Sequence, residues 1–275
     1  MNKILVTGGT GFLGHALIKR LVMNWPQAEI RVLARNEGKL IELQKEFPRI
    51  RIFPGDVSDS CIVEYCLKDV DTLFHLAAFK HVGLAEIHSH QCTSTNVIGT
   101  MNLLKHFKGQ KFIAISTDKT AKISGVYGAT KRVMEKLIEE RAKIDDDVRY
   151  IVPRYGNVIG STGSVIPKWI DICRNGGEMI ITDGTATRFF FTVEQAVDLI
   201  FEAMKKADSG LPYIKPMKAC TIEDLSEAII QKYGDPYNVK YIGLQPGENM
   251  HEYLSDEYCS ADAERLTIAE LMEMI

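Results

Sequence analysis

The chain has 275 residues, of which 45% are hydrophobic and 25% charged, a composition typical of a globular protein with a full hydrophobic core. Its formal net charge of −3 provides no basic field, so we expect neither nucleic acid nor a membrane surface as a partner. The six cysteines contain no C-x-x-C pair, so we expect reduced thiols and no metal site. The first residues show no signal-peptide pattern, and no apolar run approaches the ~18 residues that span a bilayer, so we expect a cytoplasmic protein.

The N-terminal segment predicts a diphosphate-binding turn between a strand and a helix. Residues 3–7 form a short apolar run, typical of a buried strand, and a helical pattern extends through Met23. Glycines at 8, 11 and 14 let the backbone approach a ligand, and the helix N-terminus presents N–H groups to an anion. The alternative is a nonspecific glycine turn. The residues expected to bind a dinucleotide here are Gly8, Thr10, Gly11, Phe12, Leu13 and Gly14.

The second strand, residues 30–34, ends at Arg35. An acidic residue at this position would bind a ribose 2′-hydroxyl, whereas an arginine suits a 2′-phosphate. Arg35, with Lys39 four residues later, therefore predicts NADP over NAD, although Arg35 can also be a plain loop residue. The third strand, residues 51–53, is followed by Asp56 and Val57, both expected at the cofactor; Asp56 can accept from an adenine amino group or cap a helix that begins near Ser58.

The fourth strand, residues 70–76, is followed by two small residues, so we expect Leu76, Ala77 and Ala78 to pass close to the cofactor. Lys80 lies on the same side, and His75 is expected to be hydrogen-bonded beside the sheet and not catalytic. A helix over residues 94–107 leads to the fifth strand. This alternation predicts an α/β fold with a Rossmann-like, doubly wound parallel sheet.

The fifth strand, from Ile113, runs into Thr117, Asp118 and Lys119, and a helix then opens on Tyr127. Lys131 follows one turn later and shares a helix face with Tyr127. Four ionisable groups therefore meet at the carboxyl edge of the sheet, where open α/β folds bind ligands. A nearby ammonium favours the phenolate of a tyrosine. The alternatives are a tyrosine and a lysine that merely share a helix, and an aspartate that caps a loop.

After a sixth strand over residues 146–152 the regular alternation ends. We expect residues 1–158 to form an NADP-binding domain and residues 159–275 to form mainly a smaller substrate-binding lobe, with 189–207 returning to the first domain. The segments expected in this half are a loop at 161–164, helices at 165–175, 193–206 and 222–233, strands at 179–181 and 240–244, an extended run at 188–193 and a weakly helical tail from 255.

With its glycine turn and its Tyr127-x-x-x-Lys131 pair, the sequence resembles the extended short-chain dehydrogenases/reductases. Four further segments, Phe74–Val82, Ser116–Lys119, Arg154–Val158 and Thr187–Phe190, resemble the polysaccharide-biosynthesis branch, and within it the UDP-N-acetylglucosamine 4,6-dehydratases of the C5-inverting type. The resemblance runs from about residue 3 to 257. The sequence departs from the family pattern at three residues: Gln245 stands where an arginine is usual, Asn249 where a lysine is usual, and Ile123 where a proline is common. It also stops short of the family's usual C-terminal segment.

The resemblance implies a tightly held, recycled NADP and a UDP-sugar substrate that is oxidised at C4, loses water across C5–C6 and regains hydride at C6. It implies that Tyr127 takes the proton of the 4-hydroxyl and that Lys131 holds the nicotinamide ribose. It further implies that Lys119 is the base at C5 and Asp118 the acid. These last two roles require a lowered pKa for Lys119 and a raised pKa for Asp118. It also implies a homo-oligomer. The residues it places at the substrate are Lys80, Thr117, Asn157, Arg188, Gln245 and Glu248.

Two other functions stay open at this point. A sugar-nucleotide epimerase can use the same fold without eliminating water, although the Asp118-Lys119 pair argues against a plain 4-epimerase. A non-catalytic NADP-binding protein is the third hypothesis, supported only by Gln245 and the shortened tail.

Overall fold

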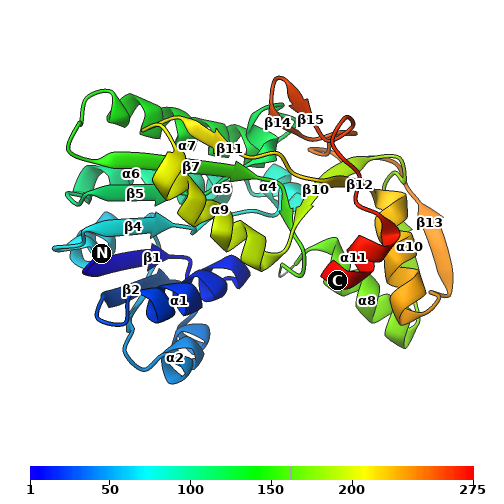
Figure 1. The fold of residues 1–275 in the computed structure, drawn as a ribbon, viewed down its shortest axis with the longest axis horizontal. Coiled ribbons are helices and arrows are strands. Elements are labelled where there is room, and N and C mark those ends of the chain that lie inside the picture. Colours follow the sequence, from blue (N-terminus) through cyan, green and yellow to red (C-terminus); the bar gives the residue numbers. More distant parts are fainter. Residues whose placement is uncertain (162) are drawn as a thin grey trace.

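The computed structural model describes residues 1–161 and 163–275; Thr162, in the expected 161–164 loop, lies outside the described residues. The central sheet is parallel, with the strand order β3-β2-β1-β4-β5-β7-β11 and the short β6 paired to β7 (Figure 1). The predicted doubly wound, Rossmann-like sheet is therefore confirmed. Its strands are β1 (Lys3–Thr7), β2 (Glu29–Ala34), β3 (Arg51–Pro54), β4 (Thr72–His75), β5 (Lys111–Ala114), β6 (Ser116–Thr117), β7 (Arg149–Tyr155) and β11 (Pro212–Ile214).

Helices cover both faces of this sheet, which explains why its central strands are almost wholly buried and apolar. On one face, Leu17 and Leu21 of α1 share a core with Ile4 and with Val197 and Ile200 of α9, so the late helix α9 packs on the first sheet. The helices of this face are α1 (Phe12–Asn24), α2 (Glu37–Glu46) and α9 (Val193–Lys206). The opposite core is covered by α3 (Ser60–Leu67), α6 (Gly99–His106) and α7 (Val126–Ala142).

The second lobe has its own core, which includes Trp169 of α8, Ile181 of β9, Leu225 and Ile229 of α10, and Leu271 of α11. Figure 1 shows it beside the main sheet. Its helices are α8 (Val165–Asn175), α10 (Ile222–Tyr233) and α11 (Ile268–Met274). Its strands are β8 (Asn157–Val158), β9 (Glu178–Ile181), β10 (Thr187–Phe191), β12 (Ala219–Thr221), β13 (Asn238–Tyr241), β14 (Tyr253–Ser255) and β15 (Tyr258–Cys259).

Most predicted elements are confirmed, but several regions differ. The tail from 255, expected to be weakly helical, opens with the β14–β15 hairpin and becomes helical only at α11, and the strands β11 and β12 were not predicted. Two further regions differ in their bounds. The helix expected from Ser94 is preceded by α4 (Val82–Ile87) and α5 (Ser89–Thr93) and begins with a π-helical turn over Ser94–Ile98; these short pieces carry too little apolar repeat to be predicted. Strand β7 continues through Pro153 to Tyr155, beyond the expected end at residue 152. Proline fits there because pairing with β5 ends at Ile151 and pairing with β6 starts at Arg154.

A buried ion pair joins three of these segments. Arg154 of β7 donates to both carboxylate oxygens of Glu135 on α7, at 3.0 and 2.7 Å, and a third nitrogen donates to the carbonyl of Leu254 in β14 at 2.6 Å. Ser116 donates to the same carboxylate at 2.6 Å. Glu135 and Arg154 are only 2% and 4% exposed, so nearly all of their polar atoms depend on these partners.

None of the helices in the part of the chain that the structure describes is long and apolar enough to cross a bilayer.

Replacing Arg154 with methionine should lower the free energy of unfolding by about 3–5 kcal/mol, because Glu135 stays buried without its main cation. Urea denaturation measures this loss. Lys136→Met is the matched control, since Lys136 is exposed and its partner Glu139 keeps a second cation, Lys143, so the unfolding midpoint should stay unchanged. Equal midpoints for the two variants would show that the buried pair contributes little.

Candidate active site

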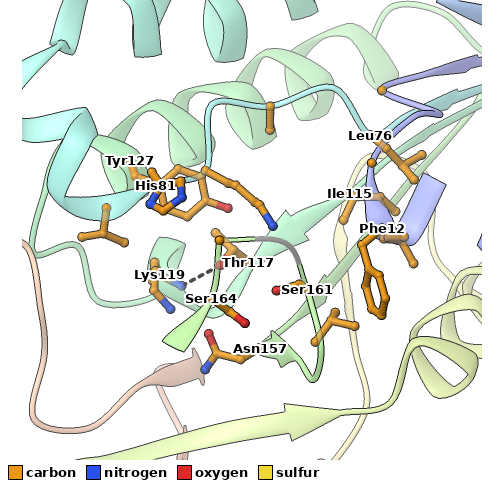
Figure 2. Close-up of a pocket in the computed structure, with 18 of the residues that line it drawn as sticks. Phe12, Leu76, His81, Ile115, Thr117, Lys119, Tyr127, Asn157, Ser161 and Ser164 are labelled. Atoms are coloured by element: carbon orange, nitrogen blue, oxygen red, sulfur yellow. Dashed lines mark hydrogen bonds between the residues drawn. The ribbon is translucent and has the colours of Figure 1, made fainter. Parts of the chain in front are cut away.

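A cavity of about 780 Å³ lies where the carboxyl ends of the central strands face the second lobe. In Figure 2, Tyr127, Thr117 and Lys119 lie on one side of it and Phe12, Leu76 and Ile115 on the other. Three residues predicted at the site, Gly14, Asp118 and Gln245, do not line the cavity. The predicted residues that do are Gly8, Thr10, Gly11, Phe12, Leu13, Arg35, Lys39, Asp56, Val57, Leu76, Ala77, Ala78, Lys80, Thr117, Lys119, Tyr127, Lys131, Asn157, Arg188 and Glu248.

The glycine turn forms a cradle that side chains would fill. Gly8 has a φ of +71°, and a Cβ there would lie 2.7 Å from the amide nitrogen of Ala77. Gly14 packs behind the turn, where a Cβ would lie 2.5 Å from the Gly8 carbonyl oxygen. Helix α1 begins beside this turn with no side-chain cap at Gly11 and no acidic residue in its first turn. This positive helix end therefore fits the diphosphate of a dinucleotide.

Two cations stand at the other end of the cavity. Arg35 and Lys39 are both exposed at its rim, and the Arg35 guanidinium lies 3.7 Å from a carboxylate oxygen of Asp56. Asp56 accepts from the amide and the hydroxyl of Ser58, at 2.9 and 2.8 Å. The suggestion that Asp56 caps the next helix is wrong, because α3 begins at Ser60 and its cap is Asp59, three residues nearer the first free amides.

His75 lies below the site and is fully hydrogen-bonded. Its two ring nitrogens contact the hydroxyls of Thr7 and Thr100, at 2.8 and 3.1 Å. Burial lowers the pKa of His75 to about 3, with a smaller contribution from Lys131. The ring is therefore neutral and structural, as the sequence predicted.

Helix α7 brings Tyr127 and Lys131 to the cavity. Its first amide, at Val126, donates to the side chain of Glu86 in α4 at 2.6 Å, which fixes the start of the helix. The Lys131 ammonium donates to the carbonyl of Ile115 at 2.6 Å, and burial lowers its pKa to about 8. Burial also raises the pKa of Tyr127 to about 12. The cation that opposes this rise is Lys119; a contribution from Lys131, expected from the sequence, is not seen.

Lys119 lies between two carboxyl groups. Its Nζ is 3.0 Å from Oδ1 of Asp118 and 3.2 Å from Oε1 of Glu252, and Nε of Arg188 lies 3.8 Å from the same Glu252 oxygen. Burial acts to lower the pKa of Lys119, but Asp118 and Glu252 outweigh it and raise the pKa. The lowered pKa expected for Lys119 is therefore wrong for this state, because the sequence did not reveal the second carboxylate.

Asp118 lies behind Lys119. Its side chain is fully buried, and Oδ1 accepts from the Thr117 hydroxyl at 2.8 Å and from Lys119. Burial raises the pKa of Asp118 against the opposing effect of Lys119, which is the direction the sequence predicted. Because Asp118 does not line the cavity, its contact with a ligand runs through its neighbours.

Glu252 is a candidate site residue that sequence reasoning missed. It is 2% exposed, lines the cavity and comes from the segment just before β14. Burial acts to raise its pKa, but Lys119 and Arg188 lower it, so the group is ionised. The sequence offered one signal: Glu252 follows Glu248 by four residues in a segment that the resemblance placed at the substrate.

The remaining predicted substrate residues occupy the second-lobe side. Asn157 donates to the carbonyl of Phe189 at 3.3 Å, and the Arg188 guanidinium donates to the carbonyls of Thr187 and Met250. Gln245 is exposed and donates to the carbonyl of Gly243 at 2.9 Å, while Glu248 accepts from the Gln245 amide. Gln245 therefore belongs to a turn at the rim and does not reach the cavity.

Four buried side-chain oxygens lack a hydrogen-bond partner among the described residues. Those of Thr95, Tyr155 and Ser164 belong to residues that line the cavity, and the fourth is Oδ2 of Asp118 directly behind it. Buried polar atoms are normally paired, so the three on the cavity lining fit a polar ligand that supplies their partners. Within residues 1–161 and 163–275, no cluster of three or more His, Cys, Asp or Glu side chains is arranged to hold a metal ion.

The sheet order, the glycine cradle and the Tyr127–Lys131 pair define an extended short-chain dehydrogenase/reductase. The model of the family described as "Polysaccharide biosynthesis protein" matches residues 4–271, and the chain belongs to this family. The resemblance found in the sequence is thus confirmed.

Three curated relatives cover nearly the whole chain. An uncharacterized membrane protein of Methanocaldococcus jannaschii is 39% identical, over 91% of this chain and 79% of its own. The UDP-N-acetylglucosamine 4,6-dehydratase (inverting) of Campylobacter jejuni is 35% identical, over 97% and 80%. The UDP-glucose 4-epimerase of Rickettsia bellii is 33% identical, over 96% and 80%. The relatives thus include both a dehydratase and an epimerase.

Among solved structures, Pen from Bacillus thuringiensis is 30% identical and superposes with a TM-score of 0.93. The match covers 100% of this chain and 96% of that chain. Both lobes therefore have their counterparts in one solved relative.

The stability of the protein should depend on pH through Lys131. Its pKa is about 8 when folded and 10.5 in a model peptide, so between these values the unfolded chain binds a proton that the folded protein does not. The free energy of unfolding of the wild type, relative to Lys131→Met, should therefore rise by up to about 3 kcal/mol from pH 8 to 10.5. Chemical denaturation across this range measures the difference, and parallel curves would contradict it.

Proposed function

We propose that the protein is an NADP-dependent UDP-N-acetylglucosamine 4,6-dehydratase, a hydro-lyase that forms a UDP-4-keto-6-deoxy-N-acetylhexosamine with inversion at C5. The observation that carries this proposal is the position of Lys119, between two carboxyl groups and in the same cavity as Tyr127 and Lys131. An oxidation at C4 needs only a base such as Tyr127. An elimination also needs an acid and a base at C5 and C6, and the Lys119 cluster supplies ionisable groups for both.

The cofactor proposed for this site is NADP, with NAD as the alternative. The glycine cradle and the uncapped start of α1 would hold the diphosphate, and Arg35 and Lys39 would hold a 2′-phosphate. Asp56 and Val57 would contact the adenosine half, and Leu76, Ala77 and Ala78 would lie along the dinucleotide. When bound, the nicotinamide would accept a hydride from the sugar and return it.

Tyr127 would accept the proton of the sugar 4-hydroxyl. Burial alone makes its phenolate unfavourable, so a nearby positive charge must compensate, and Lys119 already does so in part. Lys131 would hold the nicotinamide ribose through its ammonium, which α7 and the Ile115 carbonyl fix at the cavity. Lys119, with the carboxyl groups of Asp118 and Glu252, would carry out the proton transfers of the elimination.

The second lobe would bind the UDP-sugar. Arg188 would neutralise diphosphate charge, and Asn157, Thr117, Lys80 and Glu248 would contact the substrate. We accordingly propose that residues 1–158 bind NADP and residues 159–275 mainly bind the substrate. The direct contact proposed for Gln245 is withdrawn in favour of a role in shaping the rim.

A UDP-sugar 4-epimerase is the second candidate, because an epimerase is among the relatives at similar identity. Such a reaction would use Tyr127 but would give the Lys119 cluster no catalytic role. In a non-catalytic NADP-binding protein, neither Tyr127 nor the Lys119 cluster would have a catalytic role.

We also propose a homo-oligomer that resides in the cytoplasm. The exposed apolar side chains Ile98, Met101 and Val133, which come from the π-helical turn, α6 and α7, are suited to contact a second copy.

Incubation with UDP-N-acetylglucosamine and NADP in deuterated water should give a 6-deoxy-4-keto product with deuterium at C5, detected by NMR. Lys119→Met should lower this activity by roughly 10²–10⁴-fold, because the elimination loses its cation, while NADP binding is retained. If every product keeps its 6-hydroxyl and only the configuration at C4 changes, the protein is an epimerase and the dehydratase proposal fails.

Arg35→Ala should weaken NADP binding by roughly 10- to 100-fold, since a charge-assisted contact contributes about 1.5–3 kcal/mol. The affinity for NAD should change less than about threefold, because NAD lacks the 2′-phosphate. Fluorescence titration with both dinucleotides measures the two constants. Arg49→Ala, an exposed arginine away from the cavity, is the control. An equal loss for NADP and NAD would remove the reason to prefer NADP.

A further inference from the structure

Two carboxyl groups flank the Lys119 ammonium, and only one of them belongs to a residue that lines the cavity. Oε1 of Glu252 lies 3.2 Å from Nζ of Lys119, and both residues line the cavity. Asp118 lies at 3.0 Å on the enclosed side, with a fully buried side chain that does not reach the cavity. A substrate bound beside Lys119 would therefore meet the carboxylate of Glu252 before that of Asp118.

The backbone of Glu252 is held firmly. Its amide donates to the hydroxyl of Ser260 at 2.9 Å, and the Ser260 amide donates back to the Glu252 carbonyl at 2.8 Å. The Ser260 hydroxyl also contacts the hydroxyl of Thr187, next to Arg188, at 2.6 Å. Two residues further on, the Leu254 carbonyl accepts from Arg154. The hairpin thus fixes Glu252 against both the sheet and the second lobe, which is the rigidity that a proton-transfer group requires.

The charges around Lys119 and Glu252 indicate which group acts as the acid and which as the base. Lys119, 3.0 and 3.2 Å from two carboxyl oxygens, is protonated, so in this state it carries a proton to give and has no free electron pair with which to accept one. Glu252 beside two cations, Lys119 and Arg188, is ionised and available to accept. The family-based roles, with Lys119 as base and Asp118 as acid, require the opposite protonation of Lys119 and a cavity position that Asp118 does not have.

We propose that Glu252 is the base that takes the C5 proton and that Lys119 is the acid that protonates the departing 6-hydroxyl. This assignment rests on the proposed dehydratase function and specifies its elimination step. Asp118 is then a positioning residue that holds Lys119 from behind.

The proton balance closes within this pair. In the 4-keto sugar, the C5–H bond breaks, its proton passes to the Glu252 carboxylate, and its electron pair forms the C5=C6 bond. The C6–O bond breaks, and the oxygen takes a proton from Nζ of Lys119 and leaves as water. Glu252 is then protonated and Lys119 neutral; transfer across their 3.2 Å contact restores both. Tyr127, which holds the 4-hydroxyl proton, would return it to C5 from the other face, and C6 would take the hydride it needs from the reduced nicotinamide, so that the C5=C6 bond becomes single.

The experiment compares Glu252→Gln, Asp118→Asn and Glu257→Gln, an exposed control on the same hairpin. Each variant is given NADP and UDP-N-acetylglucosamine in deuterated water, and NMR follows C5 deuterium and the 6-deoxy product. Glu252→Gln should lose roughly 10²–10⁴-fold in both, while NADP binding and NADPH formation change less than about threefold. In Asp118→Asn, deuterium should enter C5 of the sugar at least about tenfold faster than in Glu252→Gln. In Glu257→Gln, the rate of deuterium incorporation should equal that of the wild type.

C5 exchange at the wild-type rate in Glu252→Gln, or slower exchange in Asp118→Asn than in Glu252→Gln, would overturn the assignment. A second readout needs no substrate: pulses of acetic anhydride at graded pH, with mass spectrometry of the Lys119 peptide, titrate its amine. Glu252→Gln should move this titration to lower pH, because the ammonium loses a carboxylate partner, and an unmoved titration refutes the pairing. If the wild type has no dehydratase activity but the Lys119 titration still moves to lower pH in Glu252→Gln, the proposed function is refuted and the pairing of Lys119 with Glu252 stands.

Discussion

The buried pair between Glu135 and Arg154 is the interaction on which the arrangement of the site depends. Glu135 belongs to α7, one turn beyond Lys131, and its carboxylate also accepts from Ser116 in the short strand β6. Arg154 belongs to β7 and reaches the Leu254 carbonyl of the C-terminal hairpin. Because neither buried charge tolerates a missing partner, the helix, the sheet edge and the hairpin are held in one relative position. These three segments carry Tyr127, Lys119 and Glu252, or lie next to the residues that do.

The charged groups of the cavity depend on this fixed arrangement of the helix, the sheet edge and the hairpin. Burial weakens the charged form of each isolated group, which is why the pKa of Tyr127 is raised and that of Lys131 is lowered. Lys119 escapes this effect because two carboxyl groups lie within 3.2 Å of its nitrogen. Such a compact cluster of like and unlike charges needs a scaffold that cannot relax. The second lobe supplies part of that scaffold through Thr187, Arg188 and the hairpin.

The sequence predicted what depends on local spacing. The strand, glycine turn and helix at Gly8, and the helical face shared by Tyr127 and Lys131, are short-range patterns, and the sheet order follows from their alternation. Glu252 could not be found in this way. Its contact with Lys119 joins distant parts of the chain, and the hairpin that carries it has no periodic signal. The protonation of Lys119 was mispredicted for the same reason, since a pKa depends on every charge nearby and not only on adjacent residues.

The structure also bears on the choice between two reactions that share an oxidation at C4. Epimerisation at that carbon requires one proton to leave and return at O4, a task for which Tyr127 suffices. Elimination requires a second acceptor and a second donor at adjacent atoms, and both must be restored before the next cycle. A carboxylate and an ammonium 3.2 Å apart on the cavity wall meet these needs, because each can regenerate the other. In an epimerase the same buried pair would serve only to hold the hairpin against the sheet edge. The placement of Glu252, more than the Asp118-Lys119 sequence motif, is therefore the stronger physical argument for elimination.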